Sequence, residues 1–150
     1  MYKEIHAKLA SITAPFQLLH PTSEFSVDFQ PLPFLFASIS ESKGGNVFGL
    51  TGADGDRLVL EIQGLWQFPE DDAVAYGLSK QLTDWLDEQV PQWLAEAGMD
   101  PGIYLPLFMN DAAGDQRVTQ SYRGYEKFKA LQRQVDPNGL WSTRGGGFKY

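Results

Sequence analysis

The chain has 150 residues, of which 43% are hydrophobic and 13% aromatic, and its formal net charge is −7 at pH 7. A chain of this length buries about 68–70% of its unfolded surface, so we expect one core and a single domain over residues 1–150. The acidic balance argues against nucleic acid as a partner, because phosphates call for a basic patch. The chain has no cysteine and no segment that resembles a signal peptide or a membrane span. We therefore expect a cytoplasmic protein without disulfides or a membrane partner.

The first predicted elements follow the hydrophobic periodicity. Apolar residues at helical spacing predict a helix over residues 2–12 that ends before Pro15. Residues 25–30 alternate apolar and polar side chains, as a half-buried strand does. Two more short strands are predicted over residues 34–39 and 46–50, on either side of a glycine turn.

The middle of the chain predicts the longest strand and the principal helix. A turn over residues 53–56 leads into a strand over residues 57–66. Pro69 and the three carboxylates after it favour a helix start, because negative charge is stabilised at that end of a helix. Pro91 is expected to bend or interrupt this helix. Its predicted buried stripe is Val74, Leu78, Leu82, Trp85, Leu86 and Val90.

The last third of the chain predicts one more strand and one more helix. Ile103–Met109 is apolar throughout, which is typical of a strand covered on both faces. After a turn-forming stretch, residues 122–135 carry apolar side chains at helical spacing, and the proline and glycine of residues 136–139 end the helix. The predicted fold class is α+β: a mostly antiparallel sheet with helices packed on one face.

Short motifs punctuate the chain from about residue 25 onward. In order they are Phe29-Gln30-Pro31-Leu32-Pro33, Gly44-Gly45-Asn46-Val47-Phe48-Gly49-Leu50, Phe108-Met109-Asn110-Asp111-Ala112, Ser121-Tyr122, Asp136-Pro137-Asn138-Gly139 and Gly146-Gly147-Phe148-Lys149. In this order they resemble the C-terminal part of FAD-linked oxidoreductases of the berberine-bridge-enzyme type, especially the fungal branch.

That resemblance implies a substrate domain whose antiparallel sheet lies over the flavin ring. Enzymes of this type bind FAD mainly through an N-terminal domain of several hundred residues, and no counterpart of that domain is found in these 150 residues. We therefore expect no cofactor, and an uncovered, aromatic-lined sheet face where the flavin would lie. Nothing in the chain has metal-ligand spacing, so no metal site is predicted.

Strand alternation selects the first candidate catalytic residues. Within residues 57–66, one side of the strand carries Leu58, Leu60, Ile62 and Trp66 and suits packing against helices, whereas the other carries Val59, Glu61, Gln63 and Leu65. Glu61 and Gln63 would then polarise a substrate carbonyl, or Glu61 would act as an acid or base. The alternative is that both are ordinary residues of a solvated face.

The remaining candidates come from loops and from the later strand. Tyr104 is the third catalytic candidate, as a hydrogen-bond donor in a mainly aromatic cleft. The candidate substrate-binding residues are Phe108, Asn110, Trp66 and His20. The alternatives are a core tyrosine, a turn-capping asparagine and an exposed loop histidine.

Three functions from different classes follow. The first and preferred one is a cofactor-independent isomerase or cyclase of secondary metabolism, such as a Diels–Alderase, which holds a reactive conformer of an apolar small molecule in an inherited flavoenzyme pocket. The second is a FAD-linked oxidoreductase fragment or subunit. The third is a non-catalytic small-molecule binding protein. Flavin absorbance of the purified protein separates the first two.

A homodimer is also expected. The predicted helix over residues 122–135 would expose Tyr125, Phe128 and Val135 as an apolar patch larger than monomers usually tolerate. A two-fold contact would bury this patch on both subunits. The basic C-terminal tail lying near the acidic body of its neighbour would add a modest attraction at low salt.

Overall fold

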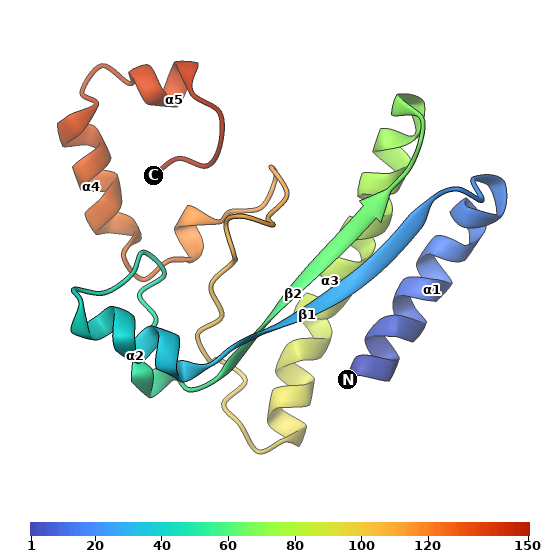
Figure 1. Ribbon diagram of the computed structural model, residues 1–150, viewed down its shortest axis with the longest axis horizontal. Helices are drawn as coiled ribbons and strands as arrows, with labels where there is room; N and C mark the ends of the chain where they lie inside the picture. Colours follow the sequence, from blue (N-terminus) through green and yellow to red (C-terminus); the bar gives the residue numbers. More distant parts are fainter. The chain divides into compact units, whose positions relative to one another are not determined.

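A computed structural model describes all 150 residues and divides them into two compact units. Unit 1 comprises residues 1–30 and 60–103, and unit 2 comprises residues 31–59 and 104–150. Helices and one two-stranded antiparallel sheet give the α+β fold class that the sequence predicts (Figure 1). The single domain expected over the whole chain stays a prediction.

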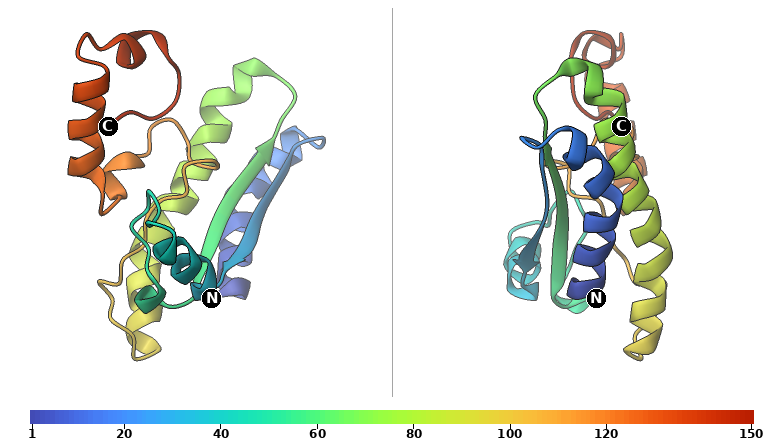
Figure 2. Two further views of the ribbon diagram at one scale, coloured as in Figure 1. Left: turned by 60° about the vertical axis from the view of Figure 1, so that its left-hand side comes forward. Right: turned by 90° about the vertical axis from the view of Figure 1, so that its right-hand side faces the viewer.

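Unit 1 packs two long helices on one face of the sheet. The helices are α1 (Tyr2–Leu19) and α3 (Asp72–Glu96), and the strands are β1 (Glu24–Leu32) and β2 (Arg57–Leu65), whose other ends belong to unit 2. Figure 2 shows both helices on the same side of the β1–β2 ribbon. The strands predicted over residues 25–30 and 57–66 are therefore confirmed, and they pair with each other.

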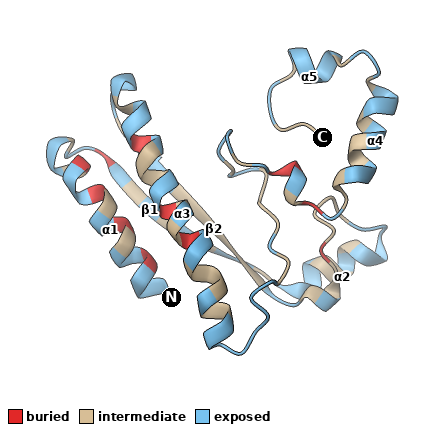
Figure 3. Cartoon of the chain, turned by 180° about the vertical axis from the view of Figure 1, so that it is seen from behind, coloured by how far each residue is buried: buried red, intermediate tan, exposed pale blue.

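The core of unit 1 joins these two helices to the inner face of the sheet. Its buried centre consists of Ile5, Leu9, Leu82 and Leu86, and buried positions recur along α1 and α3 in Figure 3. The half-buried side chains around it include Phe25, Val27, Phe29, Leu60 and Ile62. Alternate residues of β1 face this core, while the residues between them are exposed, as the period of two requires.

Each of the two long helices contains a proline, and neither helix ends there. α1 continues through Pro15 to Leu19 because Phe16 beyond it is only 6% exposed, and burial of that ring offsets one lost backbone hydrogen bond. Pro91 lies inside α3 without interrupting it. Val74, predicted to be buried, is 53% exposed, and the adjacent Ala75 occupies the buried stripe instead.

Unit 2 contains shorter elements joined by long loops. Its helices are α2 (Phe34–Ser42), α4 (Tyr125–Val135) and α5 (Leu140–Arg144). The strand predicted over residues 34–39 is wrong, because Pro33 and a 2.8 Å hydrogen bond from the Phe34 amide to Asp56 Oδ1 start a helix there. The strands predicted over residues 46–50 and 103–109 are also wrong, since neither segment pairs with a sheet.

The C-terminal tail returns onto α4. Tyr150 lies over Phe128 and Tyr125, with ring centroids 5.3 and 6.3 Å apart, and its amide donates to Gln132 Oε1 at 2.8 Å. Tyr125 and Phe128 are therefore half-buried rather than exposed, whereas Val135 is 68% exposed. The apolar patch is smaller than the sequence indicated, and the homodimer stays a prediction.

One charged anchor holds the loops of unit 2 together. The Arg123 guanidinium donates to both carboxylate oxygens of Asp54, at 2.7 and 2.8 Å, and to the Gly49 carbonyl at 2.9 Å. The same guanidinium lies 3.9 Å from the centroid of the Tyr104 ring. Segments separated by up to 74 residues of sequence are thus fixed by one side chain.

Position 49, beside Arg123, has room only for glycine. Its φ is +73°, and an added Cβ would lie 2.8 Å from Arg123 Cβ. We expect Gly49→Ala to lower the free energy of unfolding by about 1–3 kcal/mol, measured by urea denaturation. Gly114→Ala, with no atom within 4 Å of the new methyl group, is the matched control and should change stability by less than about 0.5 kcal/mol. Equal stability of the two variants would contradict the tight approach at Gly49.

Candidate functional site

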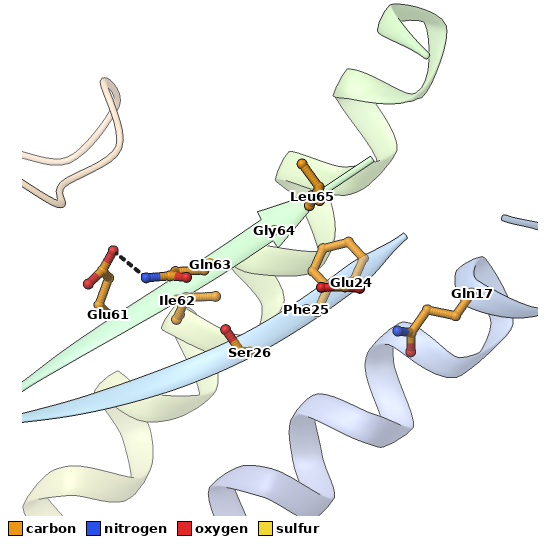
Figure 4. A pocket seen from close by; sticks show the side chains of 9 residues that line it. All are labelled: Gln17, Glu24, Phe25, Ser26, Glu61, Ile62, Gln63, Gly64 and Leu65. Carbon is orange, nitrogen blue, oxygen red and sulfur yellow. Dashed lines mark hydrogen bonds between the residues drawn. The ribbon is translucent and has the colours of Figure 1, made fainter. Parts of the chain in front are cut away.

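A shallow groove of about 790 Å³ lies along the paired ends of β1 and β2 in unit 1. We call it the strand groove. Both strands line it, and Gln17 of α1 reaches it from the helix layer (Figure 4). The lining residues from the strands are Glu24, Phe25, Ser26, Glu61, Ile62, Gln63, Gly64 and Leu65. Two candidate catalytic residues, Glu61 and Gln63, therefore share one concave surface.

Glu61 and Gln63 are joined directly. Gln63 Nε2 donates to Glu61 Oε1 at 3.0 Å, because alternate residues of a strand project to the same side. Glu61 is half-buried and Gln63 is exposed. The pair offers a carboxylate acceptor and an amide donor at adjacent points, which suits a substrate hydroxyl, amine or polarised carbonyl.

The outer face of the sheet is polar, not aromatic as the family resemblance implied. Phe25 and Phe29 point to the helices, so Ser26, Asp28 and Gln30 are left on the exposed side of β1. Glu24 adds another carboxylate to the strand groove, and its apolar lining comes from Phe25, Ile62 and Leu65, the last of which is 63% exposed. The expected aromatic-lined face is therefore corrected to an acidic and amide-rich one.

The structure places Trp66 and His20 at the start of α3. Trp66 Nε1 donates to Asp72 Oδ1 at 2.7 Å, and its ring packs edge-on against Tyr76. His20 Nδ1 lies 3.2 Å from Asp71 Oδ2, and its ring stacks on Phe16 at 4.2 Å. Both side chains already have partners that fix the helix start, so their substrate-binding role stays a prediction.

The other three candidates belong to unit 2. The Tyr104 hydroxyl donates to the Phe48 carbonyl and accepts from the Arg123 amide at 2.9 Å, so it holds loops together, as expected of a satisfied tyrosine. Phe108 stacks on Phe48 with centroids 5.8 Å apart. Asn110 is exposed in a turn. Tyr104 and Phe108 thus share Phe48 as a neighbour, although neither lies on a strand.

Two residues outside the predicted site candidates, Arg57 and Tyr122, have unusual surroundings. Arg57, the first residue of β2, lines a second cavity in unit 2, and the only signal for it was a basic residue opening an apolar strand. Tyr122 is 3% exposed, and burial of its hydroxyl raises its pKa to about 12. No cluster of three or more His, Cys, Asp or Glu side chains is placed to hold a metal ion. No helix has both the length and the apolar character needed to cross a membrane.

Several curated fungal proteins are similar to most of this chain. The chain is 33% identical over 124 residues to the FAD-dependent monooxygenase drtC of Aspergillus calidoustus, which is 81% of this chain and 22% of that protein. It is 30% identical over 123 residues to the FAD-dependent monooxygenase AOL_s00215g279 of Arthrobotrys oligospora, and 32% identical over 117 residues to the FAD-dependent monooxygenase tpcD of Cochliobolus heterostrophus. The chain is related to part of these fungal flavoenzymes.

The similarity covers most of this chain but only a small part of each relative. The chain spans about one fifth of the length of the curated relatives it matches, since the matched segments make up 21–22% of those proteins. No family model matches the chain, and no solved structure matches it. The similarity to the three monooxygenases confirms the relation to flavoenzymes that the motifs indicated.

Neither the strand groove nor the start of α3 fits the pyrophosphate of FAD. Glu24 and Glu61 line the groove, and a carboxylate there repels a phosphate. The N-terminus of α3, which would otherwise attract an anion, is preceded and opened by Glu70, Asp71 and Asp72. These acidic residues therefore do not suit a phosphate-binding site.

Proposed function

We propose that this chain forms the substrate side of a flavin-dependent oxidoreductase of the berberine-bridge type, acting on a small molecule of secondary metabolism. The similarity to FAD-dependent monooxygenases over about four fifths of the chain carries this proposal. The order of the motifs along the chain supports the finer assignment to the berberine-bridge type. In this proposal the flavin phosphates are held by residues outside the strand groove and outside the start of α3.

The strand groove supplies the substrate contacts in this proposal. Glu61 accepts a hydrogen bond or a proton from a substrate hydroxyl or amine, and Gln63 Nε2, 3.0 Å from Glu61 Oε1, fixes the direction of that carboxylate. The acidic lining favours a substrate that presents hydrogen-bond donors on this side. The groove is wide and open, so a second surface is needed to enclose the substrate.

The Glu61–Gln63 pair also favours a second candidate. A carboxylate and an amide that are already hydrogen-bonded can orient a polarised group without any cofactor. A cofactor-independent isomerase or cyclase, Diels–Alderase-like and acting on an apolar small molecule, would use them in this way. A non-catalytic binding protein would use the same groove for recognition alone.

The test transfers the matched residues into a relative. The 124 matched residues of the Aspergillus calidoustus monooxygenase are replaced by those of this chain, and bound flavin and turnover of that enzyme's own substrate are measured. We expect the chimera to keep its flavin, and Glu61→Gln within it to lower turnover about 10-fold or more. Glu96→Gln, at an exposed position of α3, is the matched control and should leave turnover unchanged. Full activity of the Glu61→Gln chimera would contradict the assignment.

A parallel measurement on the isolated chain separates the two candidates. We expect FAD to leave its melting temperature unchanged, since a ligand that binds only the folded state must raise apparent stability. Glu61→Gln and Gln63→Ala should change the free energy of unfolding by less than about 0.5 kcal/mol, whereas Leu60→Ala on the core side should cost about 2 kcal/mol or more. Substrate conversion by the isolated, colourless chain would favour the isomerase or cyclase instead.

A further inference from the structure

Unit 2 contains an apolar cavity of about 160 Å³, which we call the unit 2 cavity. Its aromatic lining consists of Phe34 and Phe36 of α2, which are 49% and 64% exposed, and of Phe48 and Phe108 from two loops. An engineered cavity of about 150 Å³ with similar lining is known to take up benzene, so this volume suits a single aromatic ring. The stacked rings of Phe48 and Phe108, 5.8 Å apart, give such a ring a flat surface to pack on.

Arg57 is the only charged residue among those that line the unit 2 cavity. Its guanidinium donates to two backbone carbonyls, from Nη1 to Asp56 at 3.0 Å and from Nε to Tyr104 at 3.4 Å. A guanidinium has five N–H donors, so donors remain for a further acceptor. The carboxylate of Asp56 forms no ion pair with it, and Asp56 Oδ1 accepts the amide that starts α2.

The contrast with Arg123 shows what Arg57 lacks. Arg123 is more exposed, yet both oxygens of Asp54 face it. Arg57 is half-buried, and no Asp or Glu oxygen lies within ion-pair distance of it. The side-chain amide of Asn46 also lines the cavity, and it already forms two hydrogen bonds with the backbone of Leu50. A half-buried cation beside apolar walls is stabilised by a ligand anion, which it can bind in a bidentate manner.

We propose that the unit 2 cavity binds a small molecule with one aromatic ring and an anionic oxygen, as in an aromatic carboxylate or phenolate. The ring packs among Phe36, Phe48 and Phe108, and the oxygen accepts hydrogen bonds from Arg57. The site lies within unit 2 and shares no residue with the strand groove. It therefore goes beyond the proposed function and does not depend on it.

Benzoate is the probe for this site, and amide resonances of the intact chain are followed by NMR during titration. We expect saturable shifts at residues of the unit 2 cavity, with benzamide, the uncharged analogue, binding at least about 10-fold more weakly. Acetate, which has the charge without the ring, should cause no saturable shift. Arg57→Gln should weaken benzoate binding at least about 10-fold, and Arg144→Gln, at an exposed arginine of the same unit, should not change it.

A second variant covers the case in which Arg57→Gln does not fold. Arg57→Lys keeps the positive charge but not the planar fork, and it should weaken benzoate binding about 3-fold or more while the spectrum stays folded. The proposal is overturned if benzoate gives no saturable shift, if benzamide or acetate binds as well as benzoate, or if both folded variants bind benzoate as the parent chain does.

Discussion

Leu82→Ala is expected to lower the free energy of unfolding by about 2–5 kcal/mol. Leu82 is fully buried, and it packs at the centre of the core with Ile5, Leu9 and Leu86. Removing its side chain loses both the apolar burial and the contacts of the atoms around it, because α1, α3 and the sheet cannot all close the cavity at once.

The measurement is urea denaturation followed by tryptophan fluorescence, with the unfolding midpoint compared at constant slope. Leu18→Ala is the matched control, since Leu18 lies on α1 of the same unit and is 83% exposed. It should change stability by less than about 0.5 kcal/mol. A Leu82→Ala midpoint as high as that of the control would mean that α1 and α3 do not share the core described here.

Asp54→Asn is expected to destabilise unit 2 by about 1.5–3 kcal/mol near neutral pH. Asp54 accepts from Arg123 through both oxygens, and its Oδ2 also accepts from the Thr51 amide at 2.8 Å. The Asp54 carboxylate is 10% exposed and the Arg123 side chain 44% exposed, so solvent screening places the effect toward the lower end of that range.

The pH dependence of this variant follows from the same contacts. Hydrogen bonds from the Arg123 guanidinium hold the pKa of Asp54 well below its usual range. A carboxyl with a lowered folded-state pKa contributes stability above its unfolded pKa of about 3.9, and that contribution is lost as the pH falls further. The difference between the parent chain and Asp54→Asn should therefore be constant from pH 7 to about pH 5 and shrink below about pH 4.

Melting temperatures across this pH range check the prediction. Asp84→Asn removes an exposed carboxylate that lies 2.8 Å from Lys80, and as a matched control it should cost less than about 1 kcal/mol. The double variant Asp54→Asn with Arg123→Gln should be less destabilised than the sum of the two single variants. Strict additivity would contradict a direct pair between the two side chains.

The sequence predicted best where burial and local periodicity agree. Phe25, Val27 and Phe29 alternate with polar residues, and Leu60 and Ile62 do the same in the partner strand, so both the strands and their inner faces were predicted correctly. The same alternation placed Glu61 and Gln63 on the opposite side, where the structure joins them by a hydrogen bond. The end of α4 at Val135, directly before Asp136 and Pro137, was also predicted correctly, whereas Gly139 precedes α5 and does not cap α4.

The sequence by itself determined the two strands, the three longest helices in outline, the end of α4 at Val135 and the relation to flavoenzymes, because periodicity, turn chemistry and motif order are properties of neighbouring residues. Only the tertiary structure decided that residues 34–42 are helical, that Phe16 carries α1 past Pro15, and that Tyr104 is committed to Phe48 and Arg123. It also decided that Arg57 lies in an apolar cavity without an acidic partner. These features depend on burial and on contacts between residues far apart in the chain, which no local pattern encodes.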